Sequence, residues 1–322
     1  MMKNIHEYNK SVLHQERVSL IKIAEMAGTP SFVYSKAKLL GQYRALKDAL
    51  EGLNFKINYS VKANSNLSIL SLLKDEGSGF DIVSAGELGR VLAIGGDPAS
   101  VVFSGVGKST EEIDFALKND IGCINVESSS ELDRIIRRAE ILSRKARVSI
   151  RVNPDVDADT HPYISTGLKE SKFGVPINQS LSLFEAANQS EHVSLEGIDC
   201  HIGSQISSVT PLAQAIKSIC KTIDELSKKN ITINHVNVGG GRGIRYKDEA
   251  ALSFRDYGQM LKDLLGNRIL QIFTDPGRSI VAESGLLLCR IEFLKKAPTA
   301  GAPSYAIVNA GMNDLIRPSL YD

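Results

Sequence analysis

The sequence predicts an α/β protein built on a (β/α)8 barrel of the TIM type, together with a second, all-β domain. Short apolar runs rich in β-branched residues alternate with amphipathic helical stretches, which is the pattern of parallel strands joined by helical crossovers. Eight such runs occur in the 322-residue chain. The eight runs lie between residues 57 and 274. This span is close to the ~250 residues of a typical barrel with eight strand–helix units and favours the barrel over an open sheet.

The eight predicted strands follow one another along the chain, and each but the last precedes a helical pattern. They are 57–61, 80–83, 101–104, 121–126, 147–152, 195–202, 232–238 and 270–274. Two helix starts carry Ser-x-x-Glu sequences, at Ser109–Glu112 and Ser128–Glu131. In such a capping box a hydroxyl and a carboxylate satisfy amide groups that lack helical partners. We therefore predict helices beginning at these two serines.

The ends of the chain have a different pattern from the centre. Residues 1–35 precede the barrel, which we place at 36–283, and residues 284–322 follow it. Both end segments contain β-type runs, at 30–34, 286–293 and 305–308. We predict that the two segments pair into the second, all-β domain. The C-terminal segment stops soon after a turn-like Arg-Pro-Ser, and we expect that it is the start of a truncated domain.

The composition excludes several classes of function. The chain has 38 basic and 37 acidic residues, so it has no basic field for nucleic acid. No apolar stretch approaches the ~20 residues of a membrane-spanning helix. The N-terminus has no apolar signal region, and we expect a cytoplasmic protein. The 4 cysteines are widely separated without a Cys-x-x-Cys pair, so we predict no metal site.

Polar residues stand at the C-terminal ends of six of the predicted strands. In a barrel of this type those ends carry the active site. On five of these strands the candidate site residues are Lys62, Asp81, His201, Ser204, Gly239, Gly240, Gly241, Asp275, Gly277 and Arg278, and the fifth predicted strand ends in Arg151–Asn153.

Lys62 and the glycine run at 239–241 are the most informative pair. A lone lysine at a strand end is often an ordinary side chain with its amine in water, and a glycine run is often only a turn. Glycines after the seventh strand, however, let backbone amides approach an anion where barrels hold phosphate. A lysine amine can form a Schiff base with an aldehyde. The two features together predict a phosphorylated aldehyde cofactor bound at Lys62.

The other candidates each have a structural and a functional interpretation. His201 is either a satisfied core histidine or a ring that stacks on a flat cofactor, with Ser204 near the phosphate. Asp275 either pairs with Arg278 or holds a pyridine nitrogen protonated. Arg278 and Arg317 can bind substrate carboxylates in a bidentate manner, although most surface arginines have no such role.

Six motifs of the chain resemble those of the fold-type III pyridoxal-phosphate-dependent decarboxylases. They are Tyr59–Asn64, Phe80–Leu88, Ser171–Gly174, His201–Gln205, Gly239–Gly243 and Asp275–Arg278. Within that family, Gln205 and the segment Asn313–Tyr321 resemble the branch that acts on diaminopimelate. The likeness extends over the whole chain.

The resemblance implies decarboxylation of meso-2,6-diaminopimelate to L-lysine and CO2, the last step of lysine biosynthesis, with pyridoxal 5'-phosphate as cofactor. It implies a small amino-acid substrate and a homodimer whose active site lies at the subunit interface. A related basic amino-acid decarboxylase, or an inactive cofactor-binding protein that lacks the family's C-terminal residues, are the alternatives.

The resemblance also implies a role for individual residues. Lys62 would bond to the cofactor and His201 would stack on its ring, so these two are the predicted catalytic residues. Asp275 stands where the family usually has glutamate. Residues expected near the phosphate are Ser204, Gly241, Gly277 and Arg278, and those expected to hold the substrate are Arg278, Arg317 and Tyr321.

Overall fold

The computed structural model describes residues 6–9, 11–157, 171–246, 248 and 251–316. The chain divides into two compact units. The larger unit is Gln42–Val281, and the smaller unit combines Met1–Gly41 with Ala282–Asp322.

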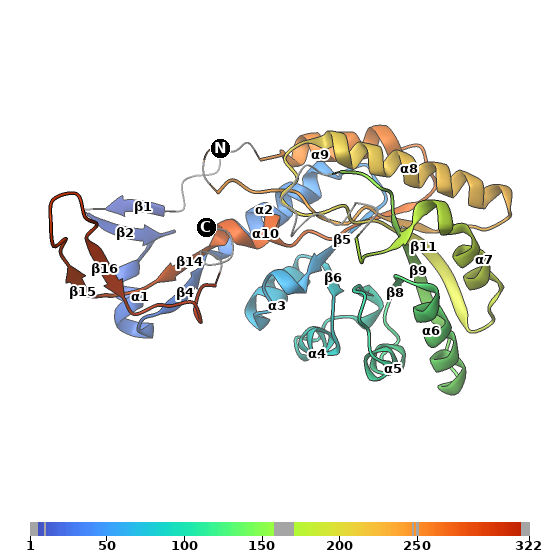
Figure 1. Cartoon of the computed structure of the whole chain (residues 1–322), viewed down its shortest axis with the longest axis horizontal. Helices are drawn as coiled ribbons and strands as arrows, with labels where there is room; N and C mark the ends of the chain where they lie inside the picture. Colours follow the sequence, from blue (N-terminus) through green and yellow to red (C-terminus); the bar gives the residue numbers. More distant parts are fainter. Residues whose placement is uncertain (1–5, 10, 158–170, 247, 249–250, 317–322) are drawn as a thin grey trace. The chain divides into compact units, whose positions relative to one another are not determined.

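Within the described part of the larger unit, eight parallel strands close into a barrel (Figure 1), which confirms the predicted fold class. The ring closes because β13 pairs with β5. The eight strands are β5 (Phe55–Ser60), β6 (Gly79–Ile82), β7 (Val101–Phe103), β8 (Cys123–Val126), β9 (Ala146–Asn153), β11 (Val193–Asp199), β12 (His235–Asn237) and β13 (Gln271–Thr274). A further short strand, β10 (Val175–Pro176), pairs with β9.

Helices alternate with these strands and pack on the outside of the barrel (Figure 1). They are α2 (Lys36–Ala49), α3 (Leu67–Asp75), α4 (Ala85–Ala93), α5 (Thr110–Lys118), α6 (Ser129–Ile141), α7 (Leu181–Gln189), α8 (Val209–Lys228), α9 (Phe254–Leu265) and the short α10 (Arg278–Val281). Four 3-10 turns are also described: Val61–Ala63, Pro98–Ser100, Ile177–Gln179 and Ala282–Ser284. Helix α6 shows the pattern of burial, because Leu132, Ile135 and Ala139 recur at helical spacing and are buried.

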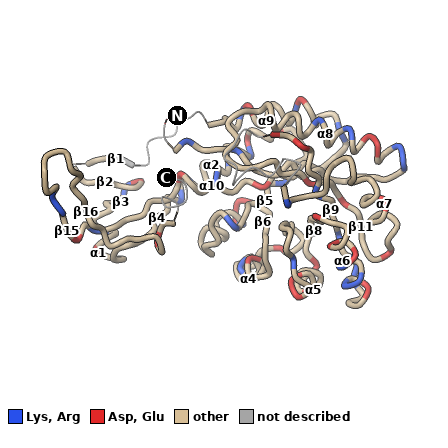
Figure 2. The backbone as a smooth tube through the Cα atoms, in the orientation of Figure 1, with Lys and Arg blue, Asp and Glu red and all other residues tan. Residues whose placement is uncertain are grey.

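The outer helices mix charges of both signs. Figure 2 shows basic and acidic residues interspersed along α4, α5 and α6. Across the described ranges, no helix has both the length and the apolar character that a membrane span requires. The same residues contain no group of three or more histidines, cysteines and carboxylates placed to hold a metal ion.

The two predicted helix starts are present, but their caps differ. Ser109 and Glu112 form the complete capping box at α5. At α6 the Ser128 hydroxyl accepts a hydrogen bond from the Glu131 amide at 3.2 Å, as predicted. The Glu131 carboxylate instead accepts from the Glu127 amide and from Lys108 Nζ, at 2.6 and 2.8 Å. The second half of that predicted box is therefore wrong, because the buried ammonium of Lys108 turns the carboxylate away from Ser128.

The smaller unit joins the two ends of the chain through antiparallel sheets. Strand β4 (Ser31–Tyr34) pairs with β14 (Gly285–Leu288), and Figure 1 shows the blue and red strands side by side. The other sheets are β1 (His6–Asn9), β2 (Val12–Gln15) and β3 (Val18–Ser19), and the hairpin β15 (Ile291–Lys295) and β16 (Tyr305–Val308). The pairing of N- and C-terminal segments is as predicted.

Helix α1 (Leu20–Ala27) is an element of the smaller unit that we did not anticipate. The Ser19 hydroxyl accepts a hydrogen bond from the Lys22 amide at its start, and Gly28 at φ 78° ends it. A serine cap before an apolar stretch and a glycine after it are the sequence signals that mark such a helix.

Candidate active site

The predicted site residues gather at the carboxyl ends of the barrel strands. Lys62 lies in the 3-10 turn directly after β5, and Asp81 is the third residue of β6. His201 follows β11, and Asp275 follows β13. Arg317 and Tyr321 lie outside the described residues.

Asp81 is the polar centre that orients Lys62. Lys62 Nζ donates a hydrogen bond to Asp81 Oδ2 at 3.3 Å. The Ser60 hydroxyl donates to the same oxygen at 3.0 Å, and the Ser104 hydroxyl donates to Oδ1 at 2.6 Å. The Asp81 carboxylate raises the pKa of Lys62 above its usual value, against an opposing effect of burial. The lysine is therefore held as an ammonium, with its side chain half exposed at the strand end.

Asp275 is a buried carboxyl group between two amide donors. Asn237 Nδ2 donates to Oδ2 at 2.6 Å, and Asn58 Nδ2 donates to Oδ1 at 3.3 Å. Burial raises the pKa of Asp275 well above its usual value, and the negative charge of Asp81 adds to the rise, while the Asn237 hydrogen bond opposes it. A positive charge placed beside Asp275 would stabilise its ionised form.

The glycine run after β12 leaves no room for side chains. A methyl group on Gly240 would lie 2.3 Å from the Asp275 carbonyl oxygen, and one on Gly241 would lie 2.4 Å from the Gly203 carbonyl oxygen. Gly239 and Gly241 adopt left-handed φ values of 67° and 94°, which glycine tolerates far better than other residues. These glycines therefore bring backbone close to the loop that carries His201 and Ser204.

His201 is in contact with this glycine run. The Gly240 amide donates a hydrogen bond to His201 Nδ1 at 3.4 Å, which places the ring proton of the neutral form on Nε2. Burial lowers the pKa of His201 well below its usual value, and the nearby positive charges of Arg151 and Lys62 lower it further. The ring is thus neutral near pH 7 and is positioned from the glycine run.

Gly277 and Arg278 join the last strand to the lysine turn. The Ser60 amide donates to the Pro276 carbonyl oxygen at 3.0 Å. A methyl group on Gly277 would lie 3.0 Å from the Ala63 side chain, so the two segments pack closely. Arg278 begins helix α10 directly after this contact.

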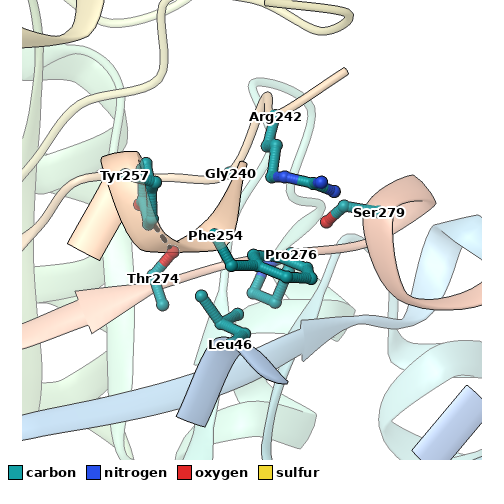
Figure 3. Close-up of a pocket in the computed structure, with 8 residues that line it drawn as sticks. All are labelled: Leu46, Gly240, Arg242, Phe254, Tyr257, Thr274, Pro276 and Ser279. Carbon is teal, nitrogen blue, oxygen red and sulfur yellow. Dashed lines mark hydrogen bonds between the residues drawn. The ribbon is translucent and has the colours of Figure 1, made fainter. Parts of the chain in front are cut away.

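A small pocket lies behind the glycine run, lined by residues that include Gly240, Arg242 and Ser279 (Figure 3). In the view, the Arg242 side chain extends toward Ser279. The Arg242 guanidinium stacks 3.9 Å from the centre of the Phe254 ring. The cavity of about 10 Å³ holds at most one water molecule. The pocket therefore lies next to the glycine run and is too small for a cofactor.

Several polar residues of the site were not among the predicted ones. Glu127 and Asp199 hold Arg151, with Glu127 Oε1 3.1 Å from Nη1 and Asp199 Oδ2 3.6 Å from Nε. Burial raises the pKa of Asp199 to about 7. Asn58 and Asn237 were also missed, although each interrupts an apolar run predicted as a strand. An amide in such a run is the signal that could have identified them.

The arrangement provides four chemical elements at one end of a rigid barrel. Lys62 supplies an amine beside a carboxylate, and the glycine run supplies backbone without side chains close to the loop of Ser204, with the Gly239 and Gly240 amides bonded to Asn237 Oδ1 and His201 Nδ1. His201 supplies a neutral flat ring, and Asp275 supplies a buried acid. A planar, phosphorylated aldehyde would use all four.

A comparison with protein families points the same way. Residues 36–282 match the model of the pyridoxal binding domain of pyridoxal-dependent decarboxylases. The chain is 50% identical over 314 residues to the diaminopimelate decarboxylase of Pseudomonas aeruginosa, covering 98% of this chain and 75% of that protein. It is 42% identical over 317 residues to the enzyme of the same name from Aquifex aeolicus, covering 98% and 74% of the two chains.

Solved structures agree with the sequence comparison. The crystal structure of diaminopimelate decarboxylase from Helicobacter pylori complexed with L-lysine matches with a TM-score of 0.90 and 44% identity, covering 94% of this chain and 75% of that one. The corresponding complex from M. jannaschii matches with a TM-score of 0.90 and 34% identity, covering 99% and 76%.

Proposed function

The chain belongs to the pyridoxal-dependent decarboxylase family, and we infer that it is a carboxy-lyase that converts meso-diaminopimelate to L-lysine and CO2 with pyridoxal phosphate. Lys62 carries this conclusion, because its amine lies 3.3 Å from Asp81 at the strand ends of the barrel. The two relatives bound to L-lysine support the substrate class.

The residues present fit the cofactor. Side chains at Gly239 and Gly241 would collide with the 200–203 segment, and one at Gly240 would collide with Asp275. The proposed phosphate site is therefore bordered here by backbone alone. Glycine backbone of this kind lets a phosphate approach the chain closely. Asp275 is buried at the neighbouring strand end, where a protonated ring nitrogen could balance its charge. We propose that Ser204, Gly277 and Arg278 complete the phosphate site.

When bound, pyridoxal phosphate withdraws the electron pair that remains when the carboxylate leaves the substrate. Lys62 must first lose a proton from Nζ to water before it can act as a nucleophile, because the neighbouring Asp81 carboxylate favours the ammonium form and holds the amine in place. Because the Asp81 carboxylate is held by Ser60 and Ser104, it stays in place as that proton moves. The Lys62–Asp81 pair therefore controls the charge of the reacting amine.

We propose different roles for His201 and Asp275: His201 stacks on the cofactor ring, and Asp275 provides a negative charge for the ring nitrogen. A neutral His201 ring offers a flat surface for stacking without adding positive charge. Asn58 and Asn237 direct their amide hydrogens at Asp275 and favour its ionised form. An ionised Asp275 would keep a ring nitrogen protonated. Asp275 is one methylene shorter than glutamate, so we propose that the contact uses a small shift or a bridging water.

Other assignments are proposals that rest on the family resemblance. We propose that Arg278 binds a substrate carboxylate, together with Arg317 and Tyr321. We also propose the domain boundaries 1–35, 36–283 and 284–322, a cytoplasmic location, and a homodimer with the active site at the subunit interface. Light scattering of the purified holoenzyme would show the mass of a dimer if this is correct.

The function is tested by replacing Lys62. We expect wild type with added pyridoxal phosphate to show a cofactor absorbance band and to release CO2 from meso-diaminopimelate. Lys62→Ala should lose the Lys62-dependent band and reduce the rate at least about 10⁴-fold, as for removal of a catalytic nucleophile.

The control is Lys229→Ala, which removes a surface lysine paired with Glu185 and should leave both readouts unchanged. A wild-type band without CO2 release would argue for an inactive cofactor-binding protein. Release from lysine or ornithine but not from diaminopimelate would argue for a related decarboxylase. A folded chain without any band would contradict the cofactor assignment.

A further inference from the structure

The side-chain amide of Gln205 joins three loops at the mouth of the barrel. Gln205 Nε2 donates to the Ile244 carbonyl oxygen, and the Ile244 amide donates to Gln205 Oε1 at 3.2 Å. Arg278 Nη1 donates to the same Oε1 at 3.2 Å. These donors fix which end of the Gln205 amide is oxygen, because only oxygen can accept from both.

The backbone around Gln205 is arranged for this contact. Gln205 has a left-handed φ of 63°, which is uncommon for a residue other than glycine. The Ile206 amide donates to the Gly241 carbonyl oxygen, and the Gly243 amide donates to the Ile206 carbonyl oxygen, both at 2.9 Å. The two segments therefore pair at Ile206, directly after Gln205, and this pairing helps to hold the Gln205 backbone in its conformation.

Gly243 leaves the space that the Gln205 side chain occupies. A methyl group on Gly243 would lie 3.1 to 3.2 Å from three carbon atoms of Gln205, including Cδ of the amide. Such distances are shorter than ordinary carbon contacts. The side chain is therefore packed against the glycine loop as well as hydrogen-bonded to it.

The contact has a direct consequence for Arg278. A guanidinium has five N–H donors in a plane, so one hydrogen bond at Nη1 sets its orientation and leaves capacity for a carboxylate. The atom that accepts the Arg278 hydrogen bond, Gln205 Oε1, belongs to a neutral amide. A carboxylate in its place would orient Arg278 equally well but would cancel the positive charge that attracts an anionic substrate.

We propose that Gln205 is a positioning residue that directs Arg278 at the carboxylate which the amino-acid substrate retains through the reaction. The proposal rests on the proposed function, in which Arg278 binds substrate. Gln205 touches neither the reacting atoms nor the substrate in this scheme and acts through Arg278. A purely structural role, in which Gln205 only ties the glycine loop to its neighbour, would instead affect cofactor binding.

The test measures two affinities separately. The affinity for L-lysine is measured on the holoenzyme, and the affinity for pyridoxal phosphate is measured on the cofactor-free chain. L-lysine serves as the probe, because it carries the retained carboxylate and binds without turnover. Gln205→Leu removes all three hydrogen bonds with little change in volume. We expect the dissociation constant for L-lysine and the KM for diaminopimelate to rise about tenfold, as for one lost hydrogen bond to a charged group. The dissociation constant for pyridoxal phosphate should rise clearly less than that for L-lysine, because Ser204, Gly277 and the glycine run still hold the phosphate, and kcat should stay near the wild-type value.

Two further variants decide whether Gln205 acts through Arg278. In an Arg278→Ala background, Gln205→Leu should have little further effect on L-lysine affinity, because coupled residues are not additive. Gln205→Glu keeps the acceptor but adds a negative charge, and it should weaken L-lysine binding at least as much as Gln205→Leu. Gln259→Leu is the matched control, since it removes an exposed glutamine whose partner is Asp263 on helix α9.

Three results would overturn the proposal: equal loss of cofactor and L-lysine affinity in Gln205→Leu, a full tenfold effect of Gln205→Leu in the Arg278→Ala background, or wild-type L-lysine binding in Gln205→Glu. The proposed function fails separately if wild type releases no CO2. In that case the L-lysine affinities alone decide the role of Gln205.

Discussion

Lys56, near the start of strand β5, and Lys62, just after its end, lie in surroundings of different kinds. Lys56 Nζ lies 5.5 Å from the centre of the Phe273 ring, and burial lowers its pKa. Lys62 faces the Asp81 carboxylate, which raises its pKa. The same residue type is therefore packed against an aromatic ring near the start of the strand and paired with a charge just beyond its end.

Two histidines of the barrel repeat this contrast. His235 opens strand β12 and stacks on Phe273 with ring centres 4.3 Å apart. His201, beyond the end of β11, is hydrogen-bonded to the Gly240 amide instead. Burial lowers the pKa of both rings. The comparison teaches that Lys56 and His235 at the amino end pack on Phe273, whereas Lys62 and His201 at the carboxyl end contact polar groups of the candidate site, at the face where barrel enzymes generally carry their active sites.

The largest effect at the carboxyl end is expected from Asp275→Asn. If an ionised Asp275 holds the cofactor ring nitrogen protonated, kcat should fall about 10³-fold, as when one electrostatic contact to developing charge is removed. Stability should not fall with it. The pKa of folded Asp275 is raised, so the folded state disfavours the ionised form, and this acid lowers the free energy of unfolding as pH rises above its unfolded pKa.

The fold can also accommodate the new amide. Asn58 Oδ1 is buried without a hydrogen-bond partner in the described structure, and a flip of Asn58 would let it accept from the new side chain. Steady-state kinetics and thermal unfolding at pH 7 test the prediction. Loss of activity together with a large drop in melting temperature would show instead that Asp275 is a structural residue.

A smaller effect is expected from Gly240→Ala. Its methyl group would lie 2.3 Å from the Asp275 carbonyl oxygen, so the glycine run must move. We expect the dissociation constant for pyridoxal phosphate to rise at least about tenfold because the glycine backbone and the His201 ring bonded to it leave their positions. An absorbance titration measures this. Gly107→Ala is the control, since a methyl group there meets open space, and equal affinity of the two variants would count against a phosphate site at Gly240.

The smallest effect on activity is expected from His235→Phe at the amino end. An unfolded histidine titrates near pH 6.5, whereas burial lowers the pKa of folded His235 to about 4. The unfolded chain therefore binds the proton first, and stability falls as pH decreases through this window. Between pH 7 and pH 5 this residue should account for about 2 kcal/mol of lost unfolding free energy.

Phenylalanine keeps a flat ring beside Phe273 and removes the titration. The unfolding free energy of His235→Phe should accordingly change less between pH 7 and pH 5 than that of wild type, and kcat should be unchanged. Denaturant unfolding at the two pH values provides the measurement. An identical pH dependence would mean that His235 does not lose its proton on folding.

The strands illustrate how far local pattern leads. The run 57–61 corresponds to Phe55–Ser60, and 195–202 corresponds to Val193–Asp199. The second difference matters, because the predicted strand included His201 while the observed strand ends before it. The strand gives way to irregular backbone where Gly203 and Gln205 adopt positive φ values. Apolar alternation indicates a strand, but its exact end depends on such loop conformations.

The site shows where local pattern stops. Lys62, Asp81, His201 and Asp275 were indicated because each follows or ends a predicted strand, and all barrel strands end at the same face. Asn58 and Asn237 lie 217 and 38 residues from Asp275 along the chain. Their convergence on one carboxyl group depends on barrel closure and register, which no local pattern contains.

The sequence by itself determined the kinds of chemistry available: a strand-end lysine, a glycine run, a histidine and an acid, placed on a repeating strand–helix pattern. The tertiary structure decided which of these meet and in which charge state. Only the folded barrel pairs Lys62 with Asp81, buries Asp275 between two amides and brings Gln205 to Arg278. The physical reason is that pKa values and hydrogen bonds depend on burial and on neighbours that are distant in sequence.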